Sequence, residues 1–283
     1  MASSTSPRQK LVIVYGIRRS GNHALIRWVM DCFEGVKLHL NDIHTKLADP
    51  YLCFLSGEVT NVSSYEIHRT HLGINRHLLE ATTIQPRQKL SVFNPGLDRD
   101  ALRSINKDLL LLSYEEVSFS NPRLTRFLEK PDKYVGPIDS ALEIVLLRDP
   151  YNLFASLLKS GMMDESSSGY YVSKYKEYGD KYLKIKEASD RGALAVTYNE
   201  FVTSPEYRIS MSNMLGGKLL AEAPASVSCY GGGSSFQPQA SQANELDTMN
   251  RWKSYVNDPL YRSLFDAEIT NLADEIFKMR NPL

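Results

Sequence analysis

The sequence predicts an α/β fold in which helices flank a mainly parallel sheet. Four short apolar runs have the pattern of strands that are buried on both faces of such a sheet. Helix patterns separate these runs, and strands that alternate with helices indicate βαβ units. The four runs are residues 11–15, 108–112, 143–147 and 193–197.

The first run opens a strand, turn and helix unit. LVIVY at 11–15 is followed by GIRRSGNH at 16–23, a turn that contains two glycines. Apolar residues after the turn are spaced as on one face of a helix. They are Leu25, Trp28, Val29 and Cys32.

The third and fourth runs continue the alternation. Asp149 and Pro150 follow the third run and are a favourable N-cap and first helical residue. A second helix is expected near Pro205, after the fourth run. The residues expected to face inward from the first of these helices are Phe154, Leu157 and Leu158.

The C-terminal third is less regular. Residues 161–186 are rich in Tyr, Ser and Lys, and their second half is expected to be a surface helix or a lid. Residues 221–240 have the composition of a loop. From Asp258 onward the spacing predicts one closing helix packed on the sheet. Its apolar face comprises Leu264, Phe265, Ile269, Leu272, Ile276 and Phe277.

Composition limits the classes of partner. The chain has 283 residues, and Lys plus Arg equal Asp plus Glu at 33 each. A formal net charge of zero disfavours nucleic acid or a long polyanionic sugar as a partner. No run is long and apolar enough to predict a membrane span.

The Ser-rich residues 1–10 are expected to be a disordered lead-in, and residues 11–283 a single domain.

The three cysteines, Cys32, Cys53 and Cys229, fit no zinc spacing and no complete set of disulfides. They are therefore interpreted as reduced thiols of a cytoplasmic protein.

Gly16 and Gly21 are spaced as in a phosphate-binding loop. Backbone N–H groups at the start of a helix attract phosphate through their partial positive charge. A nucleotide kinase has Lys and then Ser or Thr at the end of such a loop, but Asn22 and His23 stand here. This loop therefore lacks the two residues with which a kinase or NTPase uses ATP and Mg²⁺. A glycine turn with a purely structural role remains the other alternative.

Two arginines, Arg18 and Arg19, precede Ser20 and Gly21. This loop resembles the 5′-phosphosulfate loop of sulfotransferases that use 3′-phosphoadenosine 5′-phosphosulfate (PAPS). A second motif, RDPYNLFAS at 148–156, resembles the segment in which that family has an Arg and a Ser eight residues apart. The likeness is greatest to a bacterial branch that acts on small molecules.

The resemblance implies a P-loop NTPase-like sulfotransferase fold and a set of cofactor contacts. Arg19 would contact the bridging oxygen of the leaving phosphate, and the backbone from Ser20 to His23 would cradle the 5′-phosphosulfate. Arg148 and Ser156 would hold the 3′-phosphate. Arg18, Gly21 and Asn22 belong to the same loop and are counted among its contacts. Weaker matches imply Tyr198 near the adenine, and Ser234, Ser235 and Arg251 in a closing segment.

The group that accepts the proton of the attacking acceptor is left open. RTHL at 69–72 resembles the family's segment with a catalytic His, which nominates His71. Glu115 follows the run 108–112 and is favoured as the base. His23, Asp42 and His44 stay in reserve, and each of these side chains could instead have a structural role.

The function expected is transfer of a sulfuryl group from PAPS to a hydroxyl or amine of a small molecule, such as a secondary metabolite, without a metal. The alternatives are the kinase or NTPase and a nucleotide-binding module without catalysis. The tyrosines of residues 161–186 could form an aromatic wall for the acceptor or be ordinary surface residues. The oligomeric state is left open.

Overall fold

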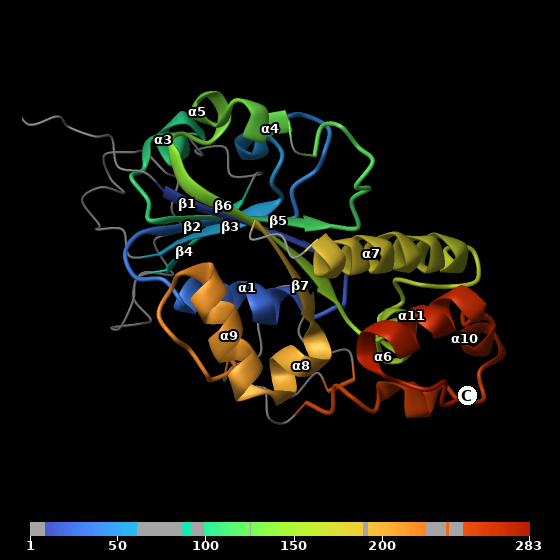
Figure 1. Cartoon of the computed structure of the whole chain (residues 1–283). Coiled ribbons are helices and arrows are strands. Elements are labelled where there is room, and N and C mark those ends of the chain that lie inside the picture. Colours follow the sequence, from blue (N-terminus) through green and yellow to red (C-terminus); the bar gives the residue numbers. More distant parts are fainter. Residues whose placement is uncertain are drawn as a thin grey trace, which may run out of the picture. The chain divides into compact units, whose positions relative to one another are not determined.

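The computed structural model describes residues 9–60, 87–91, 99–124, 126–188, 192–224, 236–237 and 246–283. Their strands form a seven-stranded sheet in the order β4-β3-β2-β5-β1-β6-β7. The sheet is mainly parallel and flanked by helices, which confirms the predicted α/β class (Figure 1). The strands are β1 (Gln9–Gly16), β2 (Lys37–Asn41), β3 (Ser56–Thr60), β4 (Arg87–Ser91), β5 (Leu109–Glu115), β6 (Ile138–Leu147) and β7 (Ala193–Thr197).

The described helices follow the predicted alternation in its main features. They are α1 (Asn22–Asp31), α3 (Arg99–Ser104), α4 (Arg126–Glu129), α5 (Pro131–Tyr134), α6 (Pro150–Lys159), α7 (Ser168–Ala188), α8 (Tyr198–Thr203), α9 (Pro205–Leu215), α10 (Pro259–Ser263) and α11 (Ala267–Phe277). Two 3₁₀ helices, η1 (Pro50–Leu52) and η5 (Arg251–Ser254), lie between them. No described helix is long and apolar enough to cross a membrane.

Three strands were not predicted, and they change one edge of the sheet. β2 pairs with β5 in parallel, from Lys37 opposite Leu109 to Leu40 opposite Leu112. β3 is antiparallel to both β2 and β4. The sequences KLHLN, SGEVT and RQKLS contain no apolar run, so their strand conformation depends on pairing with neighbours and is not visible in local composition.

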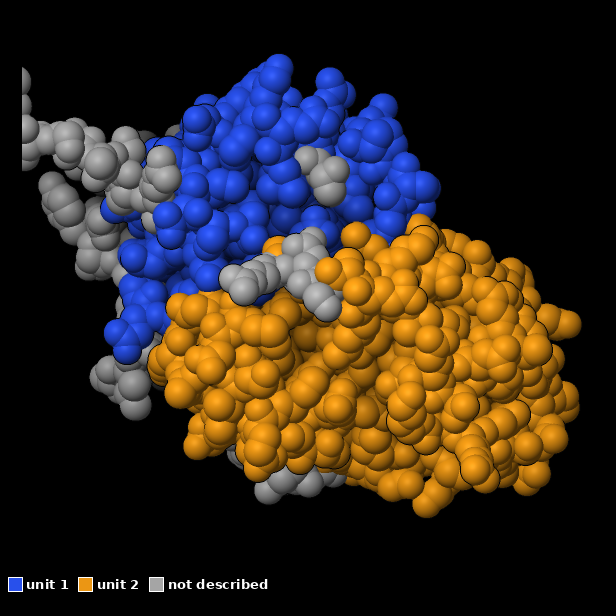
Figure 2. All heavy atoms as spheres, in the orientation of Figure 1, with its two compact units in different colours: residues 1–15, 33–143 blue, residues 16–32, 144–283 orange. Residues whose placement is uncertain are grey.

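The chain divides into two compact units, residues 1–15 with 33–143 and residues 16–32 with 144–283 (Figure 2). They are called unit 1 and unit 2 below. The single domain over residues 11–283 stays a prediction. β1 begins at Gln9, so Gln9 and Lys10 belong to a strand and not to the predicted lead-in, whose other residues lie outside the described ones.

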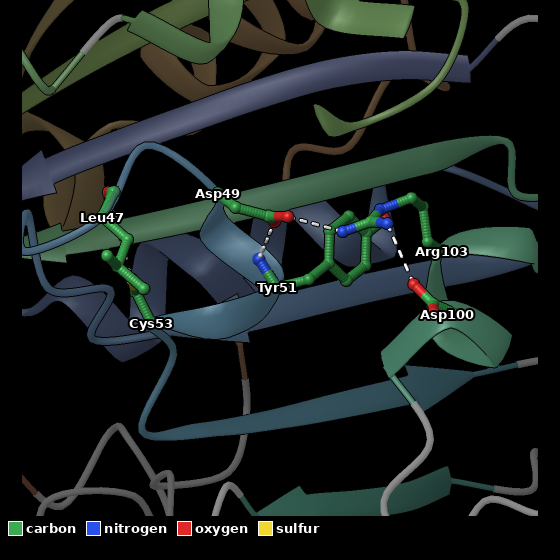
Figure 3. Close-up of polar contacts among 6 residues, drawn as sticks. All are labelled: Leu47, Asp49, Tyr51, Cys53, Asp100 and Arg103. Carbon is green, nitrogen blue, oxygen red and sulfur yellow. Dashed lines mark hydrogen bonds and ion pairs between the residues drawn. The ribbon is translucent and has the colours of Figure 1, made fainter. Parts of the chain in front are cut away.

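In unit 1, a network of ion pairs and hydrogen bonds joins η1 to α3 (Figure 3). The Arg103 guanidinium pairs with Asp49 at 2.5 Å and with Asp100 at 3.0 Å, and Asp49 also accepts a bond from the Tyr51 N–H at 3.0 Å. The buried ring of Tyr51 lies 5.4 Å from the Arg103 guanidinium and 5.9 Å from the Lys107 ammonium. Burial, and then the charge of Arg103, lower the pKa of Lys107 to about 8.

This lowered pKa predicts that unit 1 becomes more stable as pH rises. Between about pH 8 and pH 10.5 the unfolded chain binds a proton at Lys107 that the folded chain has lost, so the free energy of unfolding increases with pH. Relative to Lys107→Met, wild-type protein should gain about 2–3 kcal/mol from about pH 7 to about pH 10, measured by urea unfolding. The comparison cancels tyrosine titration, and parallel pH curves for the two proteins would contradict the expectation.

The long helix α7 of unit 2 is a packed helix. It contacts β7 and α11, and a Cβ added at Gly179 would lie 2.9 Å from Leu272 of α11. Four of its tyrosines, at helical spacing, are buried. They therefore form neither an exposed aromatic wall nor a solvated surface, the two expectations from the sequence. They are Tyr171, Tyr175, Tyr178 and Tyr182.

The C-terminal region contains two helices where one was predicted. Asp258 caps α10 through the Tyr261 N–H, and Asp266 caps α11 through the Ile269 N–H. Because Asp266 has an extended backbone, it ends any continuous helix through this region. Lys176 of α7 pairs with Asp266 and Glu268, each at 2.7 Å, so α11 packs on α7.

Candidate anion-binding site

The loop between β1 and α1 has an unusual backbone. Arg19 has φ 67° and Gly21 has φ 94°, and Gly21 is the N-cap of α1 without any side-chain capping bond. A turn bond from the Ser20 N–H to the Ile17 carbonyl, 3.1 Å long, closes the loop. Left-handed residues of this kind at a helix N-terminus shape a concave set of N–H groups that suits an anion.

Neighbouring side chains lie so close to both glycines of the loop that neither position has room for a Cβ atom. A Cβ at Gly16 would lie 1.9 Å from Oδ1 of Asn22, and a Cβ at Gly21 would lie 2.1 Å from the Tyr198 ring. Asn22 stands where a kinase has its lysine, and its Nδ2 donates to the Ile17 carbonyl at 3.2 Å. The Asn22 side chain therefore braces the loop.

Arg148 reaches this loop from the end of β6. Its side chain is almost completely buried, with Nη1 donating to the Arg19 carbonyl at 3.2 Å and Nη2 donating to the Thr248 carbonyl. Its guanidinium lies 5.0 Å from the centre of the Tyr198 ring, and Nε has no partner among the described residues. The Arg148 carbonyl accepts a bond from the Tyr175 hydroxyl at 3.2 Å, which fixes the residue from α7.

Arg251 and Ser156 form a second buried pair. Nη1 of Arg251 donates to Oγ of Ser156 at 2.8 Å, and the guanidinium lies 5.1 Å from the Phe236 ring centre. Burial, and then the charges of Arg148 and Arg19, lower the pKa of Arg251 to about 9, against an opposing effect of Tyr198. The guanidinium stays charged at neutral pH, since about 9 is well above 7.

Three arginines from distant parts of the sequence therefore act on one another within unit 2. Burial also lowers the pKa of Arg148, and Tyr198 and Asp149 only partly offset it. The described hydrogen bonds of the Arg148 side chain run to carbonyl oxygens and not to carboxylates. Because a buried charge is costly unless it is paired, an anion bound here would stabilise the cluster. The cluster comprises Arg19, Arg148 and Arg251.

A buried carboxylate orders the polar groups beside this cluster. Asp149, which was predicted to cap α6, does so by accepting a bond from the Asn152 N–H at 2.9 Å. Its carboxylate also accepts bonds from the side-chain amides of Asn152 and Asn199. Asn152, Asn199 and Tyr175 were not singled out in the sequence. The one signal for Asn152 is its position, a polar residue in the otherwise apolar stretch after Pro150.

The remaining candidates divide by location. In the loop, Ser20 is buried, its Oγ has no partner among the described residues, and Arg18 and His23 are half-buried. Glu115 lies in unit 1 as the last residue of β5, not after the strand as predicted, because β5 continues three residues beyond the apolar run. The reserve candidates Asp42 and His44 also belong to unit 1, and His71, Ser234 and Ser235 lie outside the described residues.

Comparison with known proteins does not identify a family for this chain. No family model matches the chain, and no curated protein matches its sequence. Among solved structures, the crystal structure of retinol dehydratase in complex with androsterone and inactive cofactor PAP is similar over 96% of this chain and 82% of that chain. Sequence identity is 13% and the TM-score is 0.41, so the function rests on the residues of the site.

Proposed function

We propose that this chain binds PAPS and transfers its sulfuryl group to a hydroxyl or amine of a small-molecule acceptor. The observation that carries the proposal is the buried guanidinium of Arg148, which lies against the glycine loop and acts electrostatically on the buried Arg251, the partner of Ser156. Two anion sites next to each other suit a nucleotide with phosphates at both its 3′ and 5′ positions.

The residues present fit such a nucleotide. The N–H groups at the start of α1 and the unpartnered Oγ of Ser20 would hold the 5′-phosphosulfate. Arg148, Ser156 and Arg251 would hold the 3′-phosphate, because each of these side chains supplies N–H or O–H donors. Tyr198, already beside Gly21 and Arg148, would border the adenine.

PAPS supplies a sulfur atom that bonds to the acceptor oxygen or nitrogen while its bond to the bridging phosphate oxygen breaks. The charge that develops on the departing phosphate would be stabilised by the Arg19 side chain and the loop N–H groups, without a metal. The acceptor proton would pass to a base, for which Glu115 or His71 is proposed. Arg18 and His23 would contribute further donors in the same loop.

The ATP alternative finds no support in the loop. A kinase-type loop uses a lysine to reach the transferred phosphate and a hydroxyl to hold Mg²⁺. The corresponding residues are Asn22, whose amide is bonded to Ile17, and His23. A nucleotide-binding module without catalysis would use the same anion site, and turnover separates it from an enzyme.

Isothermal calorimetry with adenosine 3′,5′-bisphosphate (PAP) and with 5′-AMP tests the proposal. PAP is expected to bind more tightly by roughly 2–4 kcal/mol, because only PAP fills the site at Arg148, Ser156 and Arg251. Equal affinities would refute it. An assay of sulfate transfer from PAPS to a panel of hydroxyl and amine acceptors then distinguishes the enzyme from a module that binds PAP without turnover.

The acceptor is proposed to be a small molecule, such as a secondary metabolite. The neutral net charge supports this choice over nucleic acid or a long polyanionic sugar. The two described cysteines, Cys32 and Cys53, are buried and not in a disulfide, which supports a cytoplasmic location as part of the same proposal.

A further inference from the structure

Asn152 of α6 holds the main chain on both sides of residue 250. Its Oδ1 accepts a bond from the Arg251 N–H at 2.8 Å, and its Nδ2 donates to the Met249 carbonyl at 3.0 Å. The side chain is completely buried, and its bond to the Arg251 N–H is buried with it. A buried amide with donor and acceptor both in use fixes its partners firmly, because breaking either bond leaves a buried polar group unpaired.

Asp149 determines which way the Asn152 amide faces. The carboxylate oxygens lie 3.0 Å and 3.1 Å from Nδ2 of Asn152. Both carboxylate oxygens accept from this nitrogen, so the NH₂ group faces Asp149 and the amide oxygen faces the Arg251 N–H. Asn199 donates to the same carboxylate at 3.0 Å.

The same face of α6 also holds the Arg251 side chain. Ser156 lies four residues after Asn152, one turn further along the helix, and its Oγ accepts the Arg251 Nη1 bond at 2.8 Å. The main chain of Arg251 is therefore fixed by Asn152 and its guanidinium by Ser156. The bond from Arg148 to the Thr248 carbonyl is a third contact that holds segment 248–251 in place.

We infer that Asn152 is a positioning residue for the 3′-phosphate site: it holds segment 248–251 on α6 so that the Arg251 guanidinium stays beside Ser156 and Arg148. The inference rests on the proposed function. Asn152 itself binds no phosphate, because its donors and acceptor are used within the protein. Its contribution is therefore to the preference for a nucleotide that carries a 3′-phosphate.

Calorimetry of Asn152→Ala with PAP and with 5′-AMP tests this role. PAP affinity is expected to fall about tenfold while 5′-AMP affinity changes less than about twofold, because one set of buried bonds to segment 248–251 is lost. Asn199→Ala is the matched control. It also loses an amide bond to Asp149, but in the described structure its side chain has no bond to segment 248–251, so the ratio of the two affinities should stay at the wild-type value.

A double-mutant cycle separates positioning from general damage to the fold. If Asn152 acts through Arg251, adding Asn152→Ala to Arg251→Ala leaves the PAP to 5′-AMP ratio unchanged. A further tenfold loss in the double variant would overturn the inference. Where Asn152→Ala unfolds more readily in urea than Asn199→Ala, Asn152→Ser is measured in its place with the same expectations.

The outcomes also separate this inference from the proposed function. A wild-type protein that does not prefer PAP over 5′-AMP refutes the proposed function itself. A wild-type preference that Arg251→Ala lowers and Asn152→Ala leaves intact refutes only the positioning role.

Discussion

Replacing Arg148 with Ala is expected to erase most of the preference for PAP over 5′-AMP. The guanidinium is buried, bonds to the glycine loop at the Arg19 carbonyl, and acts electrostatically on Arg251. A charge-assisted phosphate contact at such a site is worth about 2–4 kcal/mol, so PAP should bind about 30- to 1000-fold more weakly. The affinity for 5′-AMP, which lacks the 3′-phosphate, should change far less.

Arg208 provides the control for truncating a buried arginine in unit 2. Its side chain is also buried and also donates to main-chain carbonyls, those of Phe201 and Ala221. Arg208→Met should therefore lower the free energy of unfolding without changing the PAP to 5′-AMP ratio. Arg148→Met, which retains more side-chain volume than Ala, gives the ratio if Arg148→Ala fails to fold. A preserved ratio in either Arg148 variant contradicts the assignment.

Replacing Arg19 with Ala should depress turnover more than it weakens cofactor binding. The contact that joins Arg19 to Arg148 uses the Arg19 carbonyl, so truncating the side chain leaves that bond available. If the guanidinium acts on charge that develops as phosphate departs, its loss should cost about 10²- to 10³-fold in kcat. Affinity for PAP should change by less than about tenfold.

Single-turnover transfer from PAPS and calorimetry with PAP measure the two effects separately. Arg27→Ala is a suitable control, because Arg27 lies in α1 and forms a surface ion pair with Asp31 at 2.9 Å. It should leave both quantities near wild type, since a surface pair contributes little. An unchanged kcat in Arg19→Ala, with PAP affinity strongly reduced, would show a ground-state binding role instead.

Local sequence was sufficient to predict the strands that carry the candidate anion site. β7 matches its predicted run, and β1 and β6 contain theirs, because each run is apolar enough to specify a buried strand without help from neighbours. The Asp149 cap was also predictable, since an Asp before a Pro at a helix start has a local cause. Arg148 and the glycine loop were therefore expected at strand ends, and Arg148 does contact the loop.

Features that depend on distant partners were not predictable. β2 is buried along its whole length although three of the five residues in its sequence, KLHLN, are polar, and only pairing with β3 and β5 makes it a strand. The tyrosines of α7 looked like surface or acceptor residues because their burial depends on β7 and α11. Beyond its position in an apolar stretch, Asn152 gave no local signal, since its role requires Met249 and Arg251, about a hundred residues away.

Under the proposed function, the clustering of Arg19, Arg148 and Arg251 should couple the lifetime of the protein in a cell to its nucleotide ligand. The like charges of the buried Arg148 and Arg251 and the half-buried Arg19 should favour opening of the empty protein, and a bound dianion would reverse this by mass action. Proteases cut chains chiefly when they open transiently. Empty molecules should therefore be degraded first, so that the amount of protein present follows the supply of activated sulfate.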